Sequence, residues 1–401
     1  MSTCRSSNGS KMMVCGNNDY FQCTEQFPSL PSVYKPTALQ QNENFVGFYD
    51  SIQDMVCGAY YGIILNEKGE LYGCGRNEYG ELSQHDESEV QNVVTNFKRI
   101  PFTHGSVKFI AANYFTSYLV TTDNNVYWSG NQTNSRRFVL HDGFAELKTS
   151  VLQGRNYNIH KIETANSSIH FVLEIQYDNG EWELFGSGNC THTYEDGTDK
   201  SNQDSNHQVY SCMKYKGGPL RILKCGGNHT MLLTLDYQLK GAGLNSRHQI
   251  GPKSGNYNLK DTIEPIGFTT HQILDITCGE NFTVYALTNN ELWFSGSCCG
   301  NNSDTFTLLT TSPAPFKFVA SGYDFVLFVD IFGVVYTNVN SLSSVPFEVG
   351  QIDLEVINKV AAGKQFAYFI HATSSKLVTE HFCKLRRVMQ EGLLYDVTIQ
   401  C

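Results

Sequence analysis

The sequence predicts an all-β protein: a seven-bladed β-propeller closed by its N- and C-terminal strands in one blade, followed by a short C-terminal helix and strand. Three observations lead to this prediction. A motif of about 50 residues recurs seven times along the chain. Each copy has the pattern of a β-hairpin. The last copy lacks a second strand, and the N-terminus carries a segment that matches the missing one.

The repeat is clearest where two glycines lie 17 residues apart, as they do at Gly58 and Gly75, at Gly226 and Gly243, and at Gly279 and Gly296. The first position of each copy, which we call the anchor, is Gly58, Ala112, Ala165, Gly226, Gly279, Gly322 or Gly363. In six of the seven copies a Tyr, Phe or His ring follows three residues later, although aromatic residues make up only 12% of the chain. Such regularity indicates a repeated structural role.

Each copy consists of an alternating apolar run, a turn and a second apolar run. The turns, such as Asp123–Asn125, Asp178–Gly180 and Asn289–Asn290, contain residues that tolerate a positive φ angle. The small anchor residue is expected where one backbone closely approaches another. One hairpin unit cannot bury both faces of its sheet, so we expect the units to stack radially and to close into a ring.

Closure of the ring is predicted from the first residues. The segment Met13–Gln22 matches Tyr72–Glu81 position for position, which places Gly16 in register with Gly75. We therefore expect the N-terminal strand to pair with the strand at Ala362–His371, because an open ring would expose two sheet edges. The predicted propeller spans residues 11–371, after a disordered N-terminus at residues 1–10.

The chain has 13 cysteines and 12 histidines, and we interpret the cysteines and His229 as structural residues of the blades. No C-x-x-C pair occurs, and Cys57, Cys225 and Cys278 each precede an anchor glycine, so packing is favoured over zinc or a disulfide framework. His229 occupies the ring position of its copy, where we expect a hydrogen bond inside the blade.

Composition and motifs argue against several classes of function. The net charge is −10, from 29 basic and 39 acidic residues, so the basic footprint of a nucleic-acid-binding protein is missing. No apolar run reaches the ~20 residues of a membrane span, and residues 1–18 lack the apolar core of a signal peptide. We expect a soluble protein of the cytoplasm or the nucleus that does not bind membranes.

No phosphate-binding loop, nucleophile elbow or H-E-x-x-H motif occurs. We therefore expect no catalytic residue, no metal and no cofactor. Two acidic loops that interrupt the repeat are the candidate partner-binding sites, because function on repeat scaffolds concentrates in such loops. Their candidate residues are Glu195, Asp196, Asp199 and Asp204 in the longer loop, and Asp86, Glu87 and Glu89 in the shorter one. The alternative is that both are flexible, solvated insertions.

The repeat frame resembles a known family. The pattern G-x-x-[H/aromatic]-T, then V-[Y/F]-x-x-G-x-N-x-x-G-[Q/E]-L, is similar to the regulator of chromosome condensation repeat, with the best copies at Gly58–Ser83 and Gly226–Gly251. That family forms seven-bladed propellers, which agrees with the independent count. A WD-type propeller is less favoured because no Trp-Asp dipeptide occurs, and the paired glycines of kelch repeats are not evident.

The tail at 372–401 differs in pattern. Residues 376–391 have one apolar stripe at helical spacing, Gly392 follows, and 393–401 alternates like a strand. This order is similar to the opening of a BTB/POZ domain, over about twenty residues. The chain stops after what would be the first strand of such a domain, so the alternatives are a truncated BTB domain and a simple helix that packs on the propeller.

Two functions from different classes are consistent with these resemblances. The first is a non-enzymatic interaction scaffold, the partner-binding part of a propeller–BTB adaptor for a cullin-type ubiquitin ligase. The second is guanine-nucleotide exchange on a small Ran-like GTPase, which the founding family member performs. No exchange residue can be carried onto this sequence, and the decayed repeats and acidic charge favour the scaffold.

Overall fold

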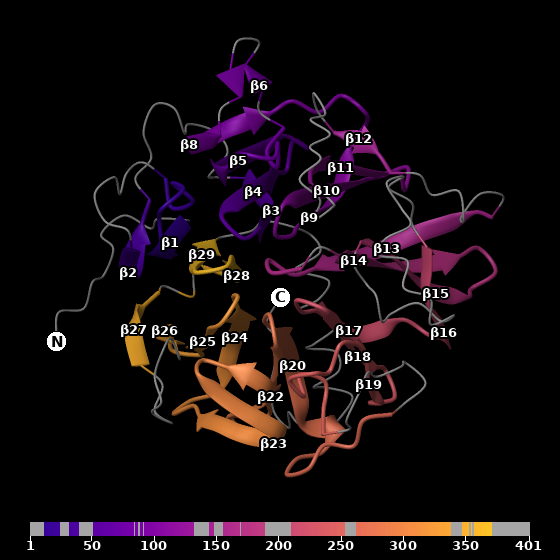
Figure 1. Cartoon of the computed structure of the whole chain (residues 1–401), viewed down its shortest axis with the longest axis vertical. Helices are drawn as coiled ribbons and strands as arrows, with labels where there is room; N and C mark the ends of the chain where they lie inside the picture. Colours follow the sequence, from indigo (N-terminus) through magenta and orange to yellow (C-terminus); the bar gives the residue numbers. More distant parts are fainter. Residues whose placement is uncertain are drawn as a thin grey trace, which may run out of the picture.

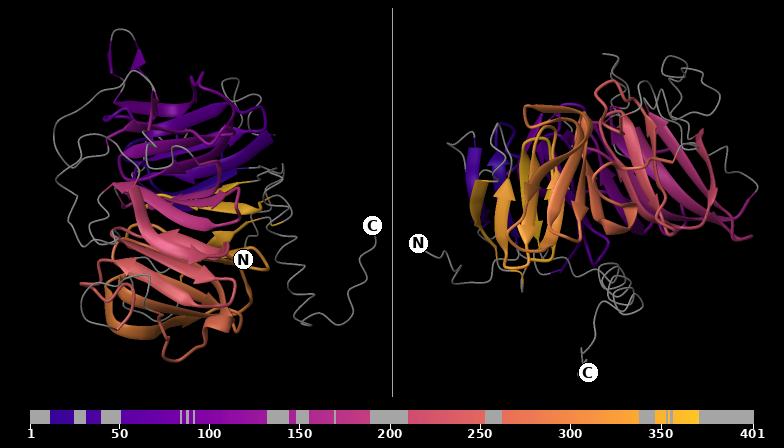
Figure 2. Two further views of the ribbon diagram at one scale, coloured as in Figure 1. Left: turned by 90° about the vertical axis from the view of Figure 1, so that its right-hand side faces the viewer. Right: turned by 90° about the horizontal axis from the view of Figure 1, so that it is seen from below.

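Seven antiparallel sheets stand around a common axis in the computed structural model of the chain (Figure 1). Viewed from the side, the strands run roughly along that axis (Figure 2). The structure describes residues 12–24, 32–39, 51–83, 85–86, 89–90, 92–131, 144–147, 155–168, 170–188, 210–252, 262–337, 347–352, 354 and 357–370. The prediction of a seven-bladed propeller is confirmed. Among these residues, no helix is long and apolar enough to cross a membrane.

Each blade begins with an inner strand beside the axis and continues outward. The inner strands are β3 (Ile52–Cys57), β9 (Val107–Ala112), β13 (Tyr157–Thr164), β17 (Leu220–Cys225), β20 (Ile273–Cys278), β24 (Phe316–Ser321) and β28 (Lys359–Ala362). The second strands are β4 (Tyr61–Asn66), β10 (Thr116–Thr121), β14 (His170–Tyr177), β18 (His229–Thr234), β21 (Phe282–Leu287), β25 (Val326–Asp330) and β29 (Phe366–Ile370). Consecutive inner strands pack on one another, and β28 packs on β3, which closes the ring.

The outer half of each blade is less regular. The third strands are β5 (Leu71–Arg76), β11 (Val126–Gly130), β15 (Trp182–Gly188), β19 (Leu239–Gly243), β22 (Glu291–Cys298), β26 (Val334–Thr337) and, in the last blade, β1 (Met12–Asn17). The fourth strands are β8 (Val93–Ile100), β12 (Ala145–Glu146), β16 (Tyr210–Gly217), β23 (Asn301–Thr311), β27 (Phe347–Gln351) and β2 (Ser32–Ala38). The remaining elements are the hairpin β6 (His85–Asp86) and β7 (Glu89–Val90) and the 3₁₀ turn η5 (Thr270–Gln272). We number the blades 1 to 7 from β3 to β28.

The two ends of the chain share blade 7. Strand β1 pairs with β29 from Met12 opposite Ile370 to Gly16 opposite Phe366. Strand β2 then covers the other edge of β1. The predicted closure is confirmed. The described strands run from Met12 to Ile370, and the expectations for residues 1–10 and 372–401 lie outside the described residues.

The second strand is buried along almost its whole length in every blade. Its two faces pack against the blades on either side, as β4 illustrates. Ile63 and Leu65 belong to the core shared with blade 2, whereas Ile64 belongs to the core shared with blade 7. Because both faces are buried, β4 is a continuous apolar run.

At both recurring glycines of the repeat a Cβ atom would collide with a neighbouring group, but the groups differ. A Cβ atom at the anchor Gly279 would lie 2.1 Å from the ring of Phe282, three residues later in the same blade. The second glycine, Gly296, has φ +101°, and its Cβ would lie 2.3 Å from the carbonyl oxygen of Asn281. The anchor glycine therefore makes room for the repeated ring. The expected backbone approach occurs at the second glycine and also at the anchors Gly58 and Gly322, where a Cβ would lie 2.6 Å from the carbonyl oxygens of Asn113 and Gly363.

The cysteines beside these glycines pack inside the sheets. Cys57, Cys74, Cys225 and Cys278 are buried free thiols, in agreement with the packing interpretation. Burial raises the pKa of Cys74 and that of Cys278 to about 12, so both stay protonated at neutral pH.

His229 differs from its prediction in one respect. Its Nε2 lies 3.0 Å from the hydroxyl of Thr283, which belongs to blade 5, so the hydrogen bond links two blades instead of lying inside one. Sequence spacing could not show this, because the contact crosses between repeats. Burial, together with the nearby His170, lowers the pKa of His229 to about 3.

Removal of residues 1–24 is expected to abolish cooperative folding. The deletion takes away β1 and leaves the edges of β29 and β2 unpaired, which favours aggregation. Circular dichroism melting and size-exclusion chromatography of the truncated chain test this. A melting temperature equal to that of the full chain would contradict it.

Replacement of His229 by Phe, the ring found in most other copies, should reduce sensitivity to acid. The unfolded chain takes up a proton on this histidine below pH ~6.5, whereas the folded chain does not until pH is about 3, so folded stability falls as pH drops through that window. We expect His229→Phe to gain roughly 1 kcal/mol per pH unit relative to the parent below pH ~6. Urea unfolding at several pH values measures this difference, and parallel pH profiles would refute the assignment.

Candidate functional site

One end of the propeller is formed by the loops that join the inner strands to the second strands; we call it the loop end. Backbone hydrogen bonds connect neighbouring loops there. Glu280 donates to the carbonyl of Tyr323 (3.0 Å), Tyr323 to that of Lys364 (3.0 Å), and Lys364 to that of Ala59 (3.1 Å). Because each loop is fixed to the next, side chains from different blades keep fixed positions relative to one another.

Lys364 in blade 7 is surrounded by tyrosines of three other blades. Its Nζ donates to the hydroxyls of Tyr60 (2.9 Å) and Tyr114 (3.1 Å) and lies 4.6 Å from the ring centre of Tyr323. Burial by itself lowers the pKa of Lys364, but the two tyrosine hydroxyls raise it, and the net direction is upward. The ammonium group therefore stays charged and holds the rings around it.

Arg76 lies beneath the same rings. Its Nε is 2.9 Å from Oε1 of Glu81, and these side chains are 5% and 0% exposed. Its Nη2 donates to the carbonyl of Tyr114 over 2.8 Å. The guanidinium carbon lies 4.8–5.9 Å from the centres of five rings, those of Tyr20, Tyr60, Tyr79, Tyr114 and Phe115. Burial raises the pKa of Glu81 to about 7, and Arg76 opposes this rise.

Five of the rings form one continuous array, and Tyr323 joins it through Lys364. Ring-centre distances are 4.9 Å for Tyr20–Tyr60, 6.1 Å for Tyr60–Tyr114, 4.3 Å for Tyr114–Phe115 and 4.8 Å for Phe115–Tyr79. We call the six half-buried rings and two cations the aromatic–cation cluster: Tyr20, Tyr60, Tyr79, Tyr114, Phe115, Tyr323, Arg76 and Lys364. It extends over blades 6, 7, 1 and 2. The cluster can stack against flat or cationic groups of a partner.

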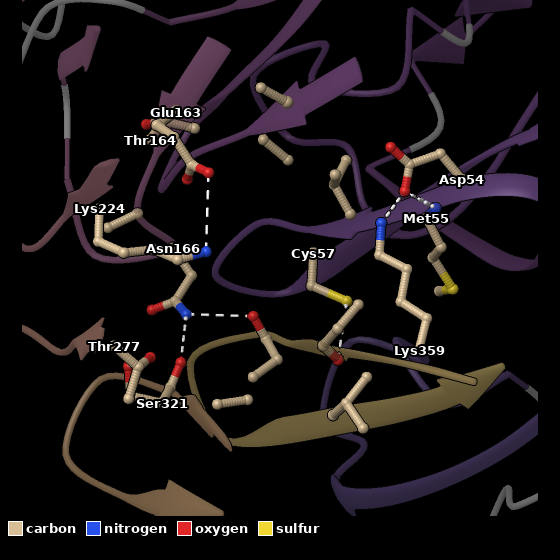
Figure 3. A pocket seen from close by; sticks show the side chains of 18 of the residues that line it. Asp54, Met55, Cys57, Glu163, Thr164, Asn166, Lys224, Thr277, Ser321 and Lys359 are labelled. Carbon is tan, nitrogen blue, oxygen red and sulfur yellow. Dashed lines mark hydrogen bonds and ion pairs between the residues drawn. The ribbon is translucent and has the colours of Figure 1, made fainter. Parts of the chain in front are cut away.

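A central channel of about 450 Å³ runs between the inner strands (Figure 3). Asn166 crosses it at the loop end, donating from Nδ2 to the carbonyls of Ser321 (3.4 Å) and Ala362 (3.1 Å) on the far side. Further along, Glu163 lies 2.9 Å from Lys161 and 3.7 Å from Lys224. The channel is thus spanned by a side chain at the loop end and carries paired charges in its interior. In the described part of the chain, no group of three His, Cys, Asp or Glu side chains is arranged to hold a metal.

The residues that the sequence singled out do not form this cluster. Glu87, Glu195, Asp196, Asp199 and Asp204 lie outside the described residues. Asp86 and Glu89 stand opposite each other in the hairpin β6–β7.

The strand ends that flank both acidic loops lie at the loop end. Gly188 of β15 is opposite His170 of β14, and Arg76 of β5 is opposite Val93 of β8. Both acidic loops therefore leave the sheets from the end that carries the aromatic–cation cluster.

Sequence reasoning missed the cluster because it followed the positions that recur. Tyr60, Tyr114, Tyr323 and Lys364 lie one or two residues after an anchor, where the residue type changes from blade to blade. The one available signal was the tyrosine at the second position after two successive anchors, Tyr60 and Tyr114.

Comparisons with known proteins agree with the geometry. Residues 52–81 match the family described as "Regulator of chromosome condensation (RCC1) repeat". The matched residues cover most of blade 1, up to the start of its outer loop. The chain is similar to the human regulator of chromosome condensation (24% identical over 137 residues, 33% of this chain). It is also similar to the Caenorhabditis elegans X-linked retinitis pigmentosa GTPase regulator homolog (28% over 97 residues, 23% of this chain). The matched stretches span only 32% and 7% of those relatives' own lengths.

Two solved structures are similar to this chain over the whole propeller. Prp20p from Saccharomyces cerevisiae matches 94% of this chain and 95% of its own, with a TM-score of 0.67 at 16% identity. Human WBSCR16 matches 91% of this chain and 99% of its own, with a TM-score of 0.65 at 12% identity. At these identities the likeness concerns the fold.

Replacement of Asn166 by Ala should destabilise the protein by roughly 1–3 kcal/mol, because the carbonyl oxygens of Ser321 and Ala362 lose a donor. The matched control is Asn302→Ala, at an exposed position of β23, which should change stability by less than about 0.5 kcal/mol. Urea unfolding of both variants measures the two effects. Equal stabilities would show that the amide does not bridge the channel.

Proposed function

We propose that this propeller is a non-enzymatic protein-interaction scaffold that binds its partner at the loop end. The aromatic–cation cluster is the observation that carries the proposal. Tyrosine and arginine are enriched where protein interfaces concentrate their binding energy, and here six rings lie half-buried around two cations. Hydrogen bonds between the loops hold the rings in place before a partner arrives, which lowers the entropic cost of binding.

The finer proposal is that the chain is the substrate- or partner-binding part of a propeller–BTB adaptor for a cullin-type ubiquitin ligase. It rests on the resemblance of residues 372–401 to the opening of a BTB domain. The direction of β29 supports it. This strand starts at the loop end with Phe366 and reaches the opposite end of the propeller at Ile370, so the described chain ends away from the aromatic–cation cluster.

Nucleotide exchange on a small Ran-like GTPase is the second candidate. The fold likeness to Prp20p favours it, because that structure is described together with binding to Gsp1p and histones. Exchange requires that the propeller bind the nucleotide-free GTPase more tightly than the nucleotide-bound form. Exchange therefore needs a surface of the propeller that binds the GTPase, and it involves no covalent chemistry.

Photo-crosslinking at the loop end tests the proposal. We expect p-benzoylphenylalanine in place of Tyr323 to crosslink a protein partner in cells. The matched control replaces Phe332, which is 65% exposed in the turn between β25 and β26 at the opposite end, and should give no such product. Crosslinks from position 332 alone would contradict the proposed face.

The identity of the crosslinked protein separates the two functions. Recovery of ligase substrates supports the adaptor, provided that residues 372–401 are needed to co-purify a cullin. Accelerated release of bound nucleotide from a purified Ran-like GTPase would replace the adaptor by the exchange function.

A further inference from the structure

Among the described residues, most exposed charges of the loop end are acidic, and the exposed Arg247 of blade 4 is the exception. Asp19, Glu78 and Asp324 are exposed, and each is the sequence neighbour of a ring of the cluster, namely Tyr20, Tyr79 and Tyr323. They come from blades 7, 1 and 6. Glu280 of blade 5 adds a half-buried carboxylate whose Oε2 is buried and has no hydrogen-bond partner among the described residues.

The two cations of the cluster present little positive charge to solvent. Arg76 is buried and paired with Glu81, so it offers little charge to solvent. The ammonium group of Lys364 is directed at two tyrosine hydroxyls and the face of a third ring. An acidic partner would meet exposed carboxylates before it met either cation.

The chain itself shows what a tyrosine and a carboxylate bind when they stand together. Arg155 lies 3.5 Å from the ring centre of Tyr177 and 2.7 Å from Oε2 of Glu181. Arg76 repeats the arrangement with Tyr79 at 5.5 Å and Glu81 at 2.9 Å. A guanidinium is planar, so it can stack on the ring while its N–H groups reach the carboxylate.

Each exposed carboxylate of the loop end also has a tyrosine as its sequence neighbour, and cations of this chain already approach those rings: Arg76 lies 5.9 Å from the ring centre of Tyr20 and 5.5 Å from that of Tyr79. In the described part of the chain, no ion pair joins the carboxylate of Asp19, Glu78 or Asp324 to an arginine. Asp19 accepts one hydrogen bond from Asn17, and Asp324 accepts one from the backbone of Cys299. Since a carboxylate has about four acceptor positions, both retain capacity for a partner. We propose that the loop end recognises an arginine-rich segment of a protein partner, whose guanidinium groups stack on the tyrosines and pair with the adjacent carboxylates.

The rest of the molecule favours the same partner. The chain as a whole carries a net charge of −10. A negative surface raises the association rate of a basic segment and repels acidic ones. The inference deepens the proposed function, because it names the chemistry of the partner at the same face.

Fluorescence anisotropy with labelled peptides tests the proposal on the full chain. The probes are peptides of about twelve residues with repeated Arg-Gly, Lys-Gly or Glu-Gly units, measured at about 50 and 300 mM NaCl. We expect Arg-Gly to bind, Lys-Gly to bind several-fold more weakly because its ammonium cannot stack, and Glu-Gly not to bind. Equal binding of Arg-Gly and Lys-Gly, or binding of Glu-Gly, would overturn the proposal.

Two charge reversals locate the site. Glu78→Lys changes the loop end, and Glu67→Lys makes the same change at an exposed position in the turn between β4 and β5 at the opposite end. We expect Glu78→Lys to weaken Arg-Gly binding roughly threefold to tenfold and Glu67→Lys to change it less than about twofold. Equal effects would mean unspecific attraction by the net charge and would overturn the proposal.

Tyr323→Leu examines the stacking separately, since it keeps an apolar side chain and removes the ring face. It should reduce the preference for Arg-Gly over Lys-Gly, and an unchanged preference would count against stacking. Unaltered melting temperatures establish that the variants are folded. A partner that crosslinks at position 323 through a segment without arginines would leave the proposed function standing and would overturn this inference.

Discussion

The pairing of β1 with β29 is the interaction on which the structure depends. Blade 7 receives its inner half from Lys359–Ile370 and its outer half from the first residues of the chain, so the sheet exists only when both ends meet. Every other blade buries its second strand between two neighbours, and blades 1 and 6 have blade 7 as one of theirs. Each hydrophobic core of the propeller therefore lies between two neighbouring blades, and blade 7 completes the two cores that it shares with blades 1 and 6.

Closure also explains how a rigid binding face arises from irregular loops. The inner strands stand in fixed order, and backbone hydrogen bonds join the loops that follow them. Tyr60, Tyr114, Tyr323 and Lys364, which are up to 304 residues apart in sequence, meet only because four blades bring them together. A partner then encounters an organised array of rings instead of independent side chains.

The sequence predicted the parts of the structure that repeat. The glycine spacing, the ring after the anchor and the match of Met13–Gln22 to blade 1 each reflect one backbone geometry used seven times, so the fold and its closure followed. The contacts between blades could not be predicted in this way. His229 bonds to Thr283 in the next blade, and the aromatic–cation cluster occupies positions that vary. Such contacts depend on which unrelated residues the ring places side by side, and a repeat pattern carries no signal for them.

Native-state hydrogen exchange of the closing sheet tests this account most directly. If the ring is one cooperative unit, the inward-paired amides of β1 and β29 exchange only through global unfolding, with the same free energy as those of β21 on the far side of the wheel. Amides of Met12–Asn17 that exchange as fast as a free chain, while those of β21 stay protected, would show that the wheel is stable without the strand that closes it.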